Sequence, residues 1–528
     1  MLTLLSRVLG LLREIISAAL FGDSSVVYDA FLFAWRIPNM FRRFLGEGAL
    51  STSLQTSLTE EDADRGDGAG RELFLATILL LLRLLGLVCG VVMVTVWLLP
   101  DFMPGTEFRW LGPHPELVRE FTVRLMPFVI FVCLTAAVGG ALNVRAHYAT
   151  PALAPVLLNL VWILSLVGIT ALLPRAEAGD WEGQLPSVRW LAWGVLLAGL
   201  VQLLLLVPAL KRRGLLVRGL SRPTAAARAK ARGVLRRSAP LALGAAVYQV
   251  NVMVDGLMAQ SLLLPGGQTV HYLANRVQQF PLALVAIAAT TAVFPALAAL
   301  GQQRRLEDLR RLHDQTQRSV LFVALPAAVG LAVLAVPVTT TLFHYGNFSE
   351  VGVERTAAAL RMLALAILPA GAVGLVARTY YSVGDYSTPV RISAVMLVAN
   401  VILNYVLLRH VGMDADGLAL ATTITSFGNL LLLLPGLRRK LELPVGQAGF
   451  ALAFARMGAA TAGCGLAAWG LQVLLGERGA RPLGLGLSIV AGIVAYLVVA
   501  RLLRVPEWAT VASRFQRIRG KMERNRRP

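Results

Sequence analysis

The chain has 528 residues, of which 56% are hydrophobic and only 15% are charged. A soluble protein carries nearer a quarter charged residues, so this composition excludes an ordinary soluble domain and indicates a membrane protein. The net charge of +20 would suggest nucleic-acid binding by a soluble domain. Here the basic residues gather in alternate loops, so we expect no nucleic acid to bind.

Apolar stretches of about 20 residues, long enough to cross the hydrocarbon core of a bilayer, recur from one end of the chain to the other. They predict an all-α polytopic membrane protein with about fourteen transmembrane helices. The predicted spans are 2–21, 26–54, 73–99, 117–145, 151–173, 188–210, 235–263, 270–300, 318–343, 354–381, 388–409, 415–436, 450–475 and 482–504. We expect the first to be a retained helix, because no basic region precedes its apolar stretch.

Lys and Arg are concentrated in every second loop. The loop after span 188–210 carries ten of them, whereas the loops "RAEAGDWEGQLPS" and "HYGNFSEVGVE" have almost none. The positive-inside rule therefore predicts that both termini are cytoplasmic. Topology alone explains the long basic loop, and attraction to anionic lipid head groups is the alternative.

Two short motifs occur once in each half of the chain. "AWRI" at Ala34–Ile37 returns as "ANRV" at Ala274–Val277, and "RAHY" at Arg145–Tyr148 returns as "RTYY" at Arg378–Tyr381. An offset of six spans preserves orientation, so we predict two six-helix lobes in parallel repeat, followed by two C-terminal helices. The predicted domains are an N-terminal lobe at 1–215, a basic cytoplasmic linker at 216–237, a C-terminal lobe at 238–440, two helices with a lipid-tail groove at 441–504, and a basic cytoplasmic tail at 505–528.

The second span contains charges where hydrocarbon is expected, in "DAFLFAWRIPNMFRRFLGEGAL" at 29–50. A charge at the centre of a bilayer costs about 2.5–3.5 kcal/mol, so these side chains should face a bundle interior or a water-filled cavity. At about 100° per residue, Asp29, Arg36, Arg43 and Glu47 share one side of the helix. Pro38 is expected to bend it.

Cations outnumber acids in spans one, two and eight. The arginines are Arg7, Arg13, Arg36, Arg42, Arg43 and Arg276, and the acids are Glu14, Asp29 and Glu47. One interpretation is mutual neutralisation, in which Glu14 pairs with an arginine, Asp29 with Arg36, and Glu47 with Arg43. Even so, three positive charges are left over. Because the planar guanidinium fork suits phosphate oxygens, the surplus predicts an anion-binding cavity.

Oxygen-bearing side chains in the second half are candidates for a Na⁺ site. Asp255 lies in span seven, Asn400 and Asn404 are one turn apart in span eleven, and Thr423 lies in span twelve. Oxygen ligands suit hard cations, but Asn and Thr commonly form hydrogen bonds between membrane helices, and this alternative stays open. We predict no other cofactor.

Enzyme signatures are missing from the sequence. It contains no phosphate-binding loop, zinc-hydrolase motif, nucleophile elbow or Cys-x-x-Cys, so we predict a transporter. The rivals are a related exporter of an O-antigen lipid or a cationic drug, a polyprenyl-phosphate glycosyltransferase and a structural scaffold. A drug exporter should have an acidic cavity, and a glycosyltransferase would need a carboxylate on an outer loop, for which Glu177, Asp180 and Glu182 are the candidates.

Several stretches resemble one known family. "SRVLGLLREIISAALFG" followed by "DAFLFAWRIPNMFRRFLGEGAL" resembles the first two helices of the MurJ (MviN-type) lipid II flippases, in the multidrug/oligosaccharidyl-lipid/polysaccharide exporter superfamily. "YLANRVQQFPLALVAIAATTAVFPALA" resembles the family's eighth helix, and "RTYYSVGDYSTPV" its turn between helices ten and eleven.

This resemblance implies a flippase of the bacterial inner membrane that serves peptidoglycan biosynthesis by alternating access. The substrate-binding residues that it implies are Arg7, Arg13, Asp29, Arg36, Arg42, Glu47 and Arg276. It also implies lipid II and membrane lipids as partners, a monomer, contacts with the cell-wall synthesis machinery, and a Na⁺ site among helices seven, eleven and twelve.

Overall fold

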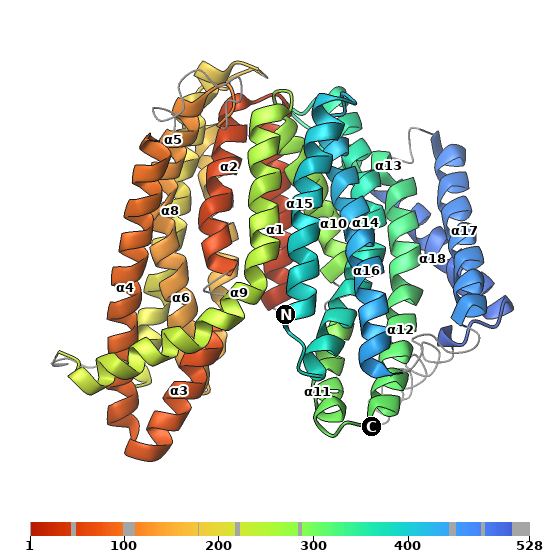
Figure 1. Cartoon of the computed structure of the whole chain (residues 1–528). Coiled ribbons are helices and arrows are strands. Elements are labelled where there is room, and N and C mark those ends of the chain that lie inside the picture. Colours follow the sequence, from red (N-terminus) through yellow and green to blue (C-terminus); the bar gives the residue numbers. More distant parts are fainter. Residues whose placement is uncertain are drawn as a thin grey trace, which may run out of the picture. The chain divides into compact units, whose positions relative to one another are not determined.

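The protein is helical throughout the residues that the computed structural model describes, which are 2–43, 49–98, 111–177, 179–216, 222–283, 288–442, 450–476 and 481–508. Every regular element in these ranges is a helix, so the all-α prediction is confirmed (Figure 1). The helices are α1 (Leu2–Phe21), α2 (Val26–Phe41), α3 (Ala49–Arg65), α4 (Asp67–Leu98), α5 (Pro115–Leu125), α6 (Pro127–Val144), α7 (Ala149–Leu172), α8 (Trp181–Arg212), α9 (Ala225–Leu262), α10 (Gly267–Leu282), α11 (Ala288–Gln302), α12 (Leu306–Val333), α13 (Ala335–Phe343), α14 (Glu350–Ser382), α15 (Ser387–Arg409), α16 (Ala415–Leu441), α17 (Phe450–Leu475) and α18 (Pro482–Leu502).

The fourteen predicted spans account for all eighteen helices in order, because four of the spans consist of two helices each. Span 117–145 is divided where Pro127 begins α6, and span 318–343 is divided at Leu334, between α12 and α13. Proline has no amide hydrogen to continue the helical ladder, which explains the first division. Span 26–54 corresponds to α2 and α3, and span 270–300 to α10 and α11. Helix α3 continues to Arg65, well beyond the predicted end of its span.

Ten helical stretches among the described residues are long and apolar enough to cross a membrane. The four predicted spans outside this set contain α1, α2 with α3, α9, and α10 with α11. These are the first two spans of each predicted half. Helices α2, α3, α10 and α11 have only 15 to 17 residues each, so each of them alone is shorter than the 18 residues of the shortest span considered.

The chain forms two compact units. Unit 1 consists of Met1–Thr269 together with Tyr345–Ser349, and unit 2 consists of Val270–His344 and Glu350–Pro528. The two lobes predicted from the repeat, 1–215 and 238–440, divide the chain at other positions. Their boundaries stay a prediction.

Aromatic side chains form the core of unit 1 around α2. Phe31 and Trp35 on α2 both pack edge-on against Trp162 of α7, at ring distances of 5.7 and 5.2 Å. Trp35 also contacts Phe128 of α6 at 5.0 Å, and Tyr28 stacks on Phe21 at 4.6 Å. Helix α2 is therefore fixed in the interior of this unit by rings on nearly every turn.

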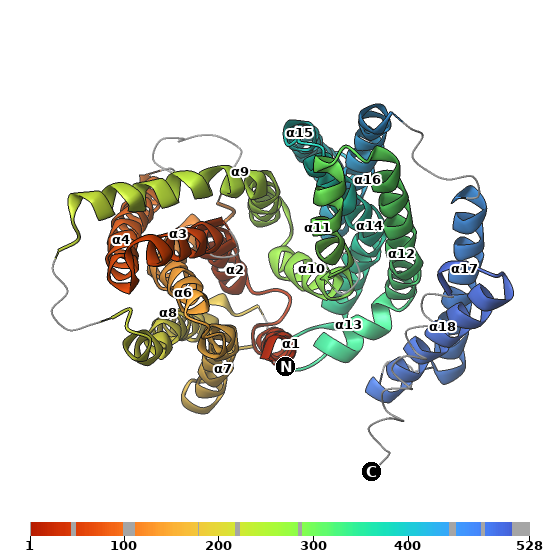
Figure 2. The same cartoon turned by 90° about the horizontal axis from the view of Figure 1, so that it is seen from below.

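Helix α9 begins inside the segment that the sequence suggested as a linker. Thr224 caps its start, because the Thr224 hydroxyl accepts a hydrogen bond from the amide of Ala227 at 3.2 Å. The first part of α9 lies across α3 and α4, and its later part runs beside α2 (Figures 1 and 2). Residues 225–237 are thus the first turns of the seventh span.

The acidic end of α3 holds basic residues from other parts of unit 1. The Lys230 ammonium on α9 donates to Glu61 at 2.7 Å, and Arg145, which follows α6, pairs with Asp62 at 3.1 Å. The side chain of Glu61 is only 11% exposed. Part of the positive charge at the start of α9 therefore serves a structural contact, a role that neither interpretation of the basic loop included.

A short segment from late in the chain is part of unit 1. The side-chain amide of Asn347 donates to the carbonyl oxygens of Leu20 and Ala176, at 2.8 and 3.1 Å. The carboxylate of Asp23 accepts from the amide and hydroxyl of Ser349, at 2.7 and 2.9 Å. Tyr345–Ser349 is thus anchored to unit 1, although its neighbours in sequence on both sides belong to unit 2.

Helix α14 forms the centre of unit 2, where α12 and α16 pack against it along much of its length. The Tyr380 hydroxyl at the end of α14 donates to the carbonyl of Leu433 on α16 at 2.8 Å. A side chain at Gly436 would clash with this hydroxyl, since its Cβ would lie 2.4 Å away. A glycine at 436 therefore allows the close approach of the two helices.

The turn between α14 and α15 is stabilised by Asp385. Its carboxylate accepts hydrogen bonds from the amide and hydroxyl of Thr388, at 3.0 and 2.8 Å, and pairs with the Lys440 ammonium at 3.4 Å. Burial raises the pKa of Asp385, but the contacts with Thr388 and Lys440 outweigh it and lower the pKa below its ordinary value.

Helices α17 and α18 pack together through small residues. The Cβ of a side chain at Gly463 would lie 3.2 Å from Val499, and one at Gly492 would lie 3.2 Å from the sulfur of Cys464. The pair is attached to α12 by the Tyr496 hydroxyl, which donates to the carbonyl of Phe322 at 2.6 Å. Close backbone approach of this kind is typical of helices that associate in lipid.

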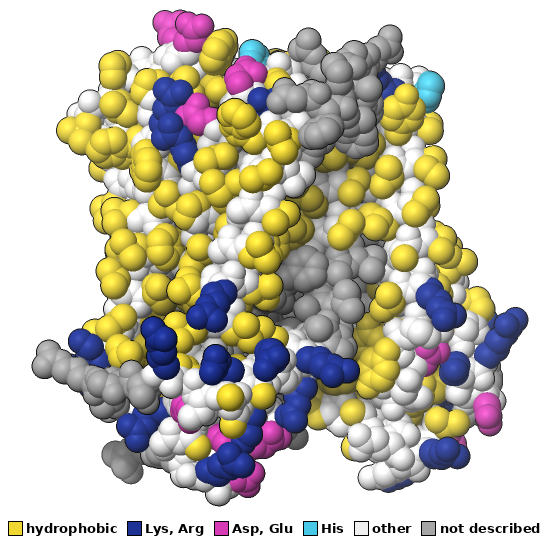
Figure 3. Space-filling view, turned by 60° about the vertical axis from the view of Figure 1, so that its left-hand side comes forward, with side chains coloured by type: hydrophobic (Ala, Val, Ile, Leu, Met, Phe, Trp, Pro, Cys, Tyr) yellow, Lys and Arg dark blue, Asp and Glu magenta, His cyan; other side chains and the backbone are white. Residues whose placement is uncertain are grey.

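The surface carries the pattern expected in a bilayer. On the face seen in Figure 3, hydrophobic side chains cover most of the height, and Lys and Arg gather toward one end. Large apolar residues such as Leu474 and Leu483 are 83% and 77% exposed. In water such a surface would drive aggregation, so a lipid environment is required.

Candidate functional site

Arg13 on α1 is a buried guanidinium with partners of three kinds. Only 5% of the residue is exposed. It pairs with the neighbouring carboxylate of Glu14, donates to the side-chain oxygen of Asn159 at 3.2 Å, and lies 4.2 Å from the ring centroid of Trp162. The predicted pairing of Glu14 with an arginine is confirmed. A cation over an indole face gains about 2 kcal/mol when it is desolvated, so the guanidinium plane is well fixed.

Helix α7 supplies the parts of this site that the sequence did not reveal. Asn159 and Trp162 are one turn apart on α7, and the Asn159 amide also donates to the carbonyl of Ser6 at 2.9 Å. The only signal was an asparagine and a tryptophan in the otherwise apolar run "LLNLVW". Arg13 and Asn159 are 146 residues apart, so no local pattern could have paired them.

Asp29 on α2 binds the backbone at the start of α10. Its carboxylate accepts from the amides of Gly266 and Thr269, at 2.7 and 2.9 Å, and from the Thr269 hydroxyl at 2.6 Å. Gly266 has φ +78°, and a side chain there would collide with the carbonyl of Asp23. These three hydrogen bonds satisfy the Asp29 carboxylate at 6% exposure, because a carboxylate near a helix N-terminus accepts from amides that have no partner within the helix.

Arg36, two turns beyond Asp29 on the same side of α2, is held against α9. One of its terminal nitrogens donates to the carbonyl of Val252 at 3.2 Å. Its side chain lies over Gly256, where an added Cβ would approach the Arg36 Cδ to 2.7 Å. The same stretch of α9 carries Asp255, which is 6% exposed and accepts from Asn251 at 3.1 Å. This part of α2 and α9 is therefore a second polar region inside unit 1.

The other predicted substrate-binding residues lie in different surroundings. Arg42 is half-buried at the end of α2 and donates to Asn39 at 3.1 Å, whereas Arg7 on α1 is exposed. Arg276 is half-buried on α10 and belongs to unit 2. Glu47 lies outside the described residues. The structure thus brings Arg13, Asp29, Arg36 and Arg42 into one unit with Arg7.

The candidate Na⁺ ligands are divided between the two units. Asp255 is in unit 1, and Asn400, Asn404 and Thr423 are in unit 2. Asn404 donates to Asn400 at 3.0 Å, and the Thr423 hydroxyl donates to the carbonyl of Met362 at 2.7 Å. Both asparagines are fully buried. The bond of Asn404 lies within α15, whereas Thr423 joins α16 to α14 and Asn400 joins α15 to α16 by donating to the Thr425 hydroxyl at 3.4 Å, so hydrogen bonding between helices occurs at two of these positions, as the alternative interpretation expected.

One of the three carboxylates proposed for a glycosyltransferase has a structural role. Asp180 caps α8, because its carboxylate accepts from the amide of Gly183 at 3.0 Å. Glu177 and Glu182 are exposed or half-buried residues beside it. Within the described ranges, no group of three or more His, Cys, Asp or Glu side chains could hold a metal ion.

Comparison with known proteins identifies the family. A family model described as "Lipid II flippase MurJ" matches residues 17–481. The chain belongs to the MurJ lipid II flippase family. A relative from Bdellovibrio bacteriovorus named "Probable lipid II flippase MurJ" is 34% identical over 95% of this chain and 92% of its own length. The "Lipid II flippase MurJ" of Burkholderia cenocepacia is 30% identical over 83% of this chain and 82% of its own length.

Solved structures support the same fold. A MurJ flippase in an inward closed conformation matches with a TM-score of 0.72 at 21% identity, covering 95% of this chain and 97% of that one. A multidrug resistance transporter of the MATE family in an inward-facing conformation matches with a TM-score of 0.65 at 15% identity, covering 83% and 96%. Flippases are transporters, so membership of the MurJ family makes this chain a transporter and not an enzyme. Its apolar helices and its family indicate a multi-pass protein of the bacterial inner membrane.

Proposed function

We propose that this chain is a lipid II flippase, which moves the undecaprenyl-pyrophosphate-linked peptidoglycan precursor from the cytoplasmic to the outer leaflet by alternating access. The family assignment and the names of its curated relatives support this function. The surplus of arginine over acidic residues in the first, second and eighth spans supports a substrate that is an anion. Both termini would lie in the cytoplasm, as the loop charges predict.

The observation that carries the proposal is the buried guanidinium of Arg13. The carboxylate of Glu14 pairs with it. A pyrophosphate has more negative charge and more acceptor oxygens than a carboxylate, and the guanidinium fork binds such oxygens in pairs. The substrate would therefore replace Glu14 as the partner of Arg13.

Asn159 and Trp162 would keep Arg13 ready for this exchange. The amide oxygen of Asn159 fixes one terminal nitrogen, and the indole of Trp162 fixes the plane of the guanidinium. A preordered side chain loses little conformational entropy when the substrate arrives. Glu14 would return to Arg13 when the substrate leaves, which would restore the empty site without leaving a buried charge uncompensated.

Arg42 and Arg276 would bind the same pyrophosphate. Arg7 and Arg36 would add to the positive potential around it. Asp29 and Glu47 would act as acidic partners of these arginines. The bound anion would offset the mutual repulsion of these arginines and so favour the closed state. A ligand shifts a conformational equilibrium only by binding one state better than the other, and charge neutralisation supplies that difference. The polyprenyl tail would stay in lipid, beside the helices of 441–504.

Asp255, Asn400, Asn404 and Thr423 would form a Na⁺ site that couples the cycle to an ion gradient. Oxygen ligands suit this cation. The protein would act as a monomer and contact the cell-wall synthesis machinery. If Na⁺ is the coupling ion, Asp255→Asn should make flipping independent of the Na⁺ concentration; a Na⁺-dependent Asp255→Asn variant would contradict the site.

The decisive experiment measures which leaflet holds lipid II in cells depleted of the wild-type protein and supplied with variants. Arg13→Ala should reduce flipping at least about 100-fold, because removing a buried charge-assisted contact costs several kcal/mol. Arg13→Lys keeps the charge but loses the planar fork, and should restore only part of the activity. Arg311→Ala is the control, since the Arg311 side chain is 61% exposed and pairs with Glu307 on the surface of α12.

Wild-type flipping by an Arg13→Ala variant that is well expressed and inserted would overturn the proposed role of Arg13. Polymerisation of sugars by the purified protein would instead support the glycosyltransferase. Transfer of an O-antigen lipid in place of lipid II would support the related exporter.

A further inference from the structure

Unit 2 contains a pocket of about 290 Å³ that is separate from all the residues discussed above. It lies between α12, α14 and α16, and Phe454 is the one residue that α17 adds to its lining. Its walls are mostly apolar, and the larger side chains are Leu321, Leu368, Phe427, Leu430, Leu434 and Phe454. Helix α18 contributes no residue to the lining.

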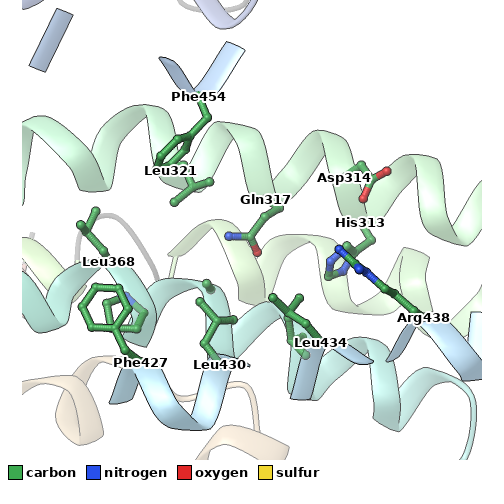
Figure 4. A pocket seen from close by; sticks show the side chains of 13 residues that line it. His313, Asp314, Gln317, Leu321, Leu368, Phe427, Leu430, Leu434, Arg438 and Phe454 are labelled. Carbon is green, nitrogen blue, oxygen red and sulfur yellow. The ribbon is translucent and has the colours of Figure 1, made fainter. Parts of the chain in front are cut away.

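The pocket has an order of polarity along its length. In Figure 4, Arg438, His313 and Asp314 lie at one end, Gln317 comes next, and leucine and phenylalanine side chains continue to the other end. His313 is already engaged, because its Nδ1 forms a 2.8 Å hydrogen bond with the hydroxyl of Thr379. The end near Arg438 corresponds to the C-terminal turn of α16, which the loop charges place at the cytoplasmic surface.

The charge at this end of the pocket is positive. Arg438 and Arg439 are exposed, and neither forms an ion pair with a residue that the structure describes. Lys440, in the same turn, pairs with Asp385. Asp314 is the single acidic residue of the lining, and at 2% exposure it is buried away from the surface. An anionic group outside the pocket would therefore meet uncompensated guanidinium.

Gln317 provides a polar contact one step deeper. Its side-chain oxygen is buried and accepts no hydrogen bond from the described residues. A buried amide without a partner costs about 1–3 kcal/mol, so a ligand that supplies the missing bond gains that energy. The amide oxygen can accept from a hydroxyl, and the amide nitrogen can donate to an ester carbonyl.

The dimensions fit a single hydrocarbon chain. Phe427 and Arg438 are eleven residues apart on α16, which corresponds to about 16 Å along the helix axis. A volume of 290 Å³ is at the lower limit of the roughly 300–1,000 Å³ typical of ligand pockets. There is room for most of one acyl chain, and the mostly apolar walls do not suit a sugar or peptide head group.

We propose that this pocket binds one acyl chain of phosphatidylglycerol. The phosphate pairs with Arg438, the glycerol and ester groups lie against Gln317, and the chain fills the space between α12 and α16 as far as Phe427. The order of phosphate, ester and hydrocarbon in the lipid matches the order of cation, amide and apolar side chains in Figure 4. The occupant comes from the leaflet that faces the C-terminal end of α16, and its binding does not depend on which substrate is transported.

Native mass spectrometry of the full-length protein, stripped of lipid and then titrated with phosphatidylglycerol, tests this site. The wild type should retain one tightly bound lipid. Leu430→Trp should lose it, because the indole occupies the space of the chain. Leu431→Trp is the matched control, since Leu431 is the next residue on α16, is 65% exposed and does not line the pocket.

A second pair of variants tests the head-group contact without altering the apolar walls. Arg438→Gln should weaken phosphatidylglycerol binding about tenfold, which is a typical effect of losing one charge-assisted hydrogen bond. Arg439→Gln removes the same charge from the same turn at a residue outside the lining, and should change the affinity less than about twofold. If Leu430→Trp fails to fold, the comparison of Arg438→Gln with Arg439→Gln still tests the proposed lipid site.

Four results would overturn the proposal. The first is that the wild type retains no phosphatidylglycerol, and the second is that Leu430→Trp and Leu431→Trp retain it equally. The third is that phosphatidylethanolamine binds as tightly as phosphatidylglycerol, which would remove the role of net charge. The fourth is that undecaprenyl phosphate displaces the bound lipid at equal concentration, which would make a polyprenyl chain the natural occupant.

Discussion

Helices α1 and α2 bury Arg13, Glu14 and Asp29, whereas α17 and α18 expose residues such as Leu474 and Leu483 over most of their surface. In the first pair, each buried charge has specific partners at fixed distances. In the second pair, glycine and alanine allow close packing, and the outward side chains need only be apolar. The two pairs are both membrane helices, but different forces determine their positions.

The difference shows where sequence changes should matter. A polar membrane helix depends on a few partners, because a buried group that loses its partner has no water to replace it. An apolar helix distributes its stability over many weak contacts, and its lipid-facing residues are nearly interchangeable. Four substitutions test this contrast, and their expected effects decrease in order.

Glu14→Gln should have the largest effect on stability. It removes the carboxylate that pairs with the buried Arg13, and breaking a buried ion pair costs roughly 3–5 kcal/mol. Unfolding by sodium dodecyl sulfate in mixed micelles measures the loss. Glu307→Gln removes one partner of an exposed pair on α12, whose side chains are both 61% exposed, and should cost less than about 0.5 kcal/mol. Equal losses in the two variants would remove the basis of the comparison.

Asp29→Asn should cost about 2 kcal/mol, because an amide retains only one of the two oxygens that accept three hydrogen bonds. Hydrogen exchange gives a local readout, since the amides of Gly266 and Thr269 should exchange faster. Asp308→Asn, at a residue with 41% side-chain exposure on α12, is the control. Unchanged exchange at Gly266 would show that Asp29 does not hold the start of α10.

Asp385 extends the comparison to a turn outside the spans. Because its pKa in the folded protein is lowered, its charge stabilises the fold above its unfolded pKa of about 3.9, and this contribution is lost as the pH falls through the lower folded value. We expect a contribution of about 1 kcal/mol, discounted because Lys440 is 54% exposed. Asp385→Asn should therefore lose less stability than the wild type between pH 6 and pH 3 in thermal unfolding. An identical pH dependence would exclude this role.

Leu474→Ala should have the smallest effect, below about 0.5 kcal/mol, because this side chain is 83% exposed and lipid replaces its contacts. Met457→Ala, on the buried side of the same helix, should cost about 2–5 kcal/mol. Thermal unfolding in lipid nanodiscs compares the two. A loss at Leu474 that approaches the loss at Met457 would mean that this face of α17 packs against protein.

The helices could be predicted from sequence because hydropathy is a local property. Among the described residues, helices occupy all fourteen predicted spans in the predicted order, and ten of these stretches are long and apolar enough to cross a membrane. Local patterns did not reveal that α3 continues to Arg65 or that α9 begins at Ala225. Both extensions are stabilised by contacts between the two helices, such as the pair of Lys230 and Glu61, and hydropathy does not report such contacts.

The candidate site was predictable in its charges but not in its partners. The sequence identified Arg13 and the need for an acid beside it, and Glu14 fulfils that need. Asn159 and Trp162 could not be predicted, because the packing of α1 on α7 brings them to Arg13. The expected pairing of Asp29 with Arg36 stays a prediction, but no local pattern could have shown that the Asp29 carboxylate also accepts from backbone amides and a threonine hydroxyl at the start of α10.

The anchoring of Tyr345–Ser349 in unit 1 has a consequence for biosynthesis. Asp23 and Ala176 emerge from the ribosome early, but Ser349 and Asn347, which they bind, follow only after residues 270–344 of unit 2 have been made. Translation proceeds at about 5–20 residues per second, so several seconds pass between the synthesis of Thr269 and the synthesis of Tyr345–Ser349, which completes the first unit. Insertion of the second unit must therefore begin before the first is complete, and truncations that end ahead of residue 345 should leave it open to proteolysis.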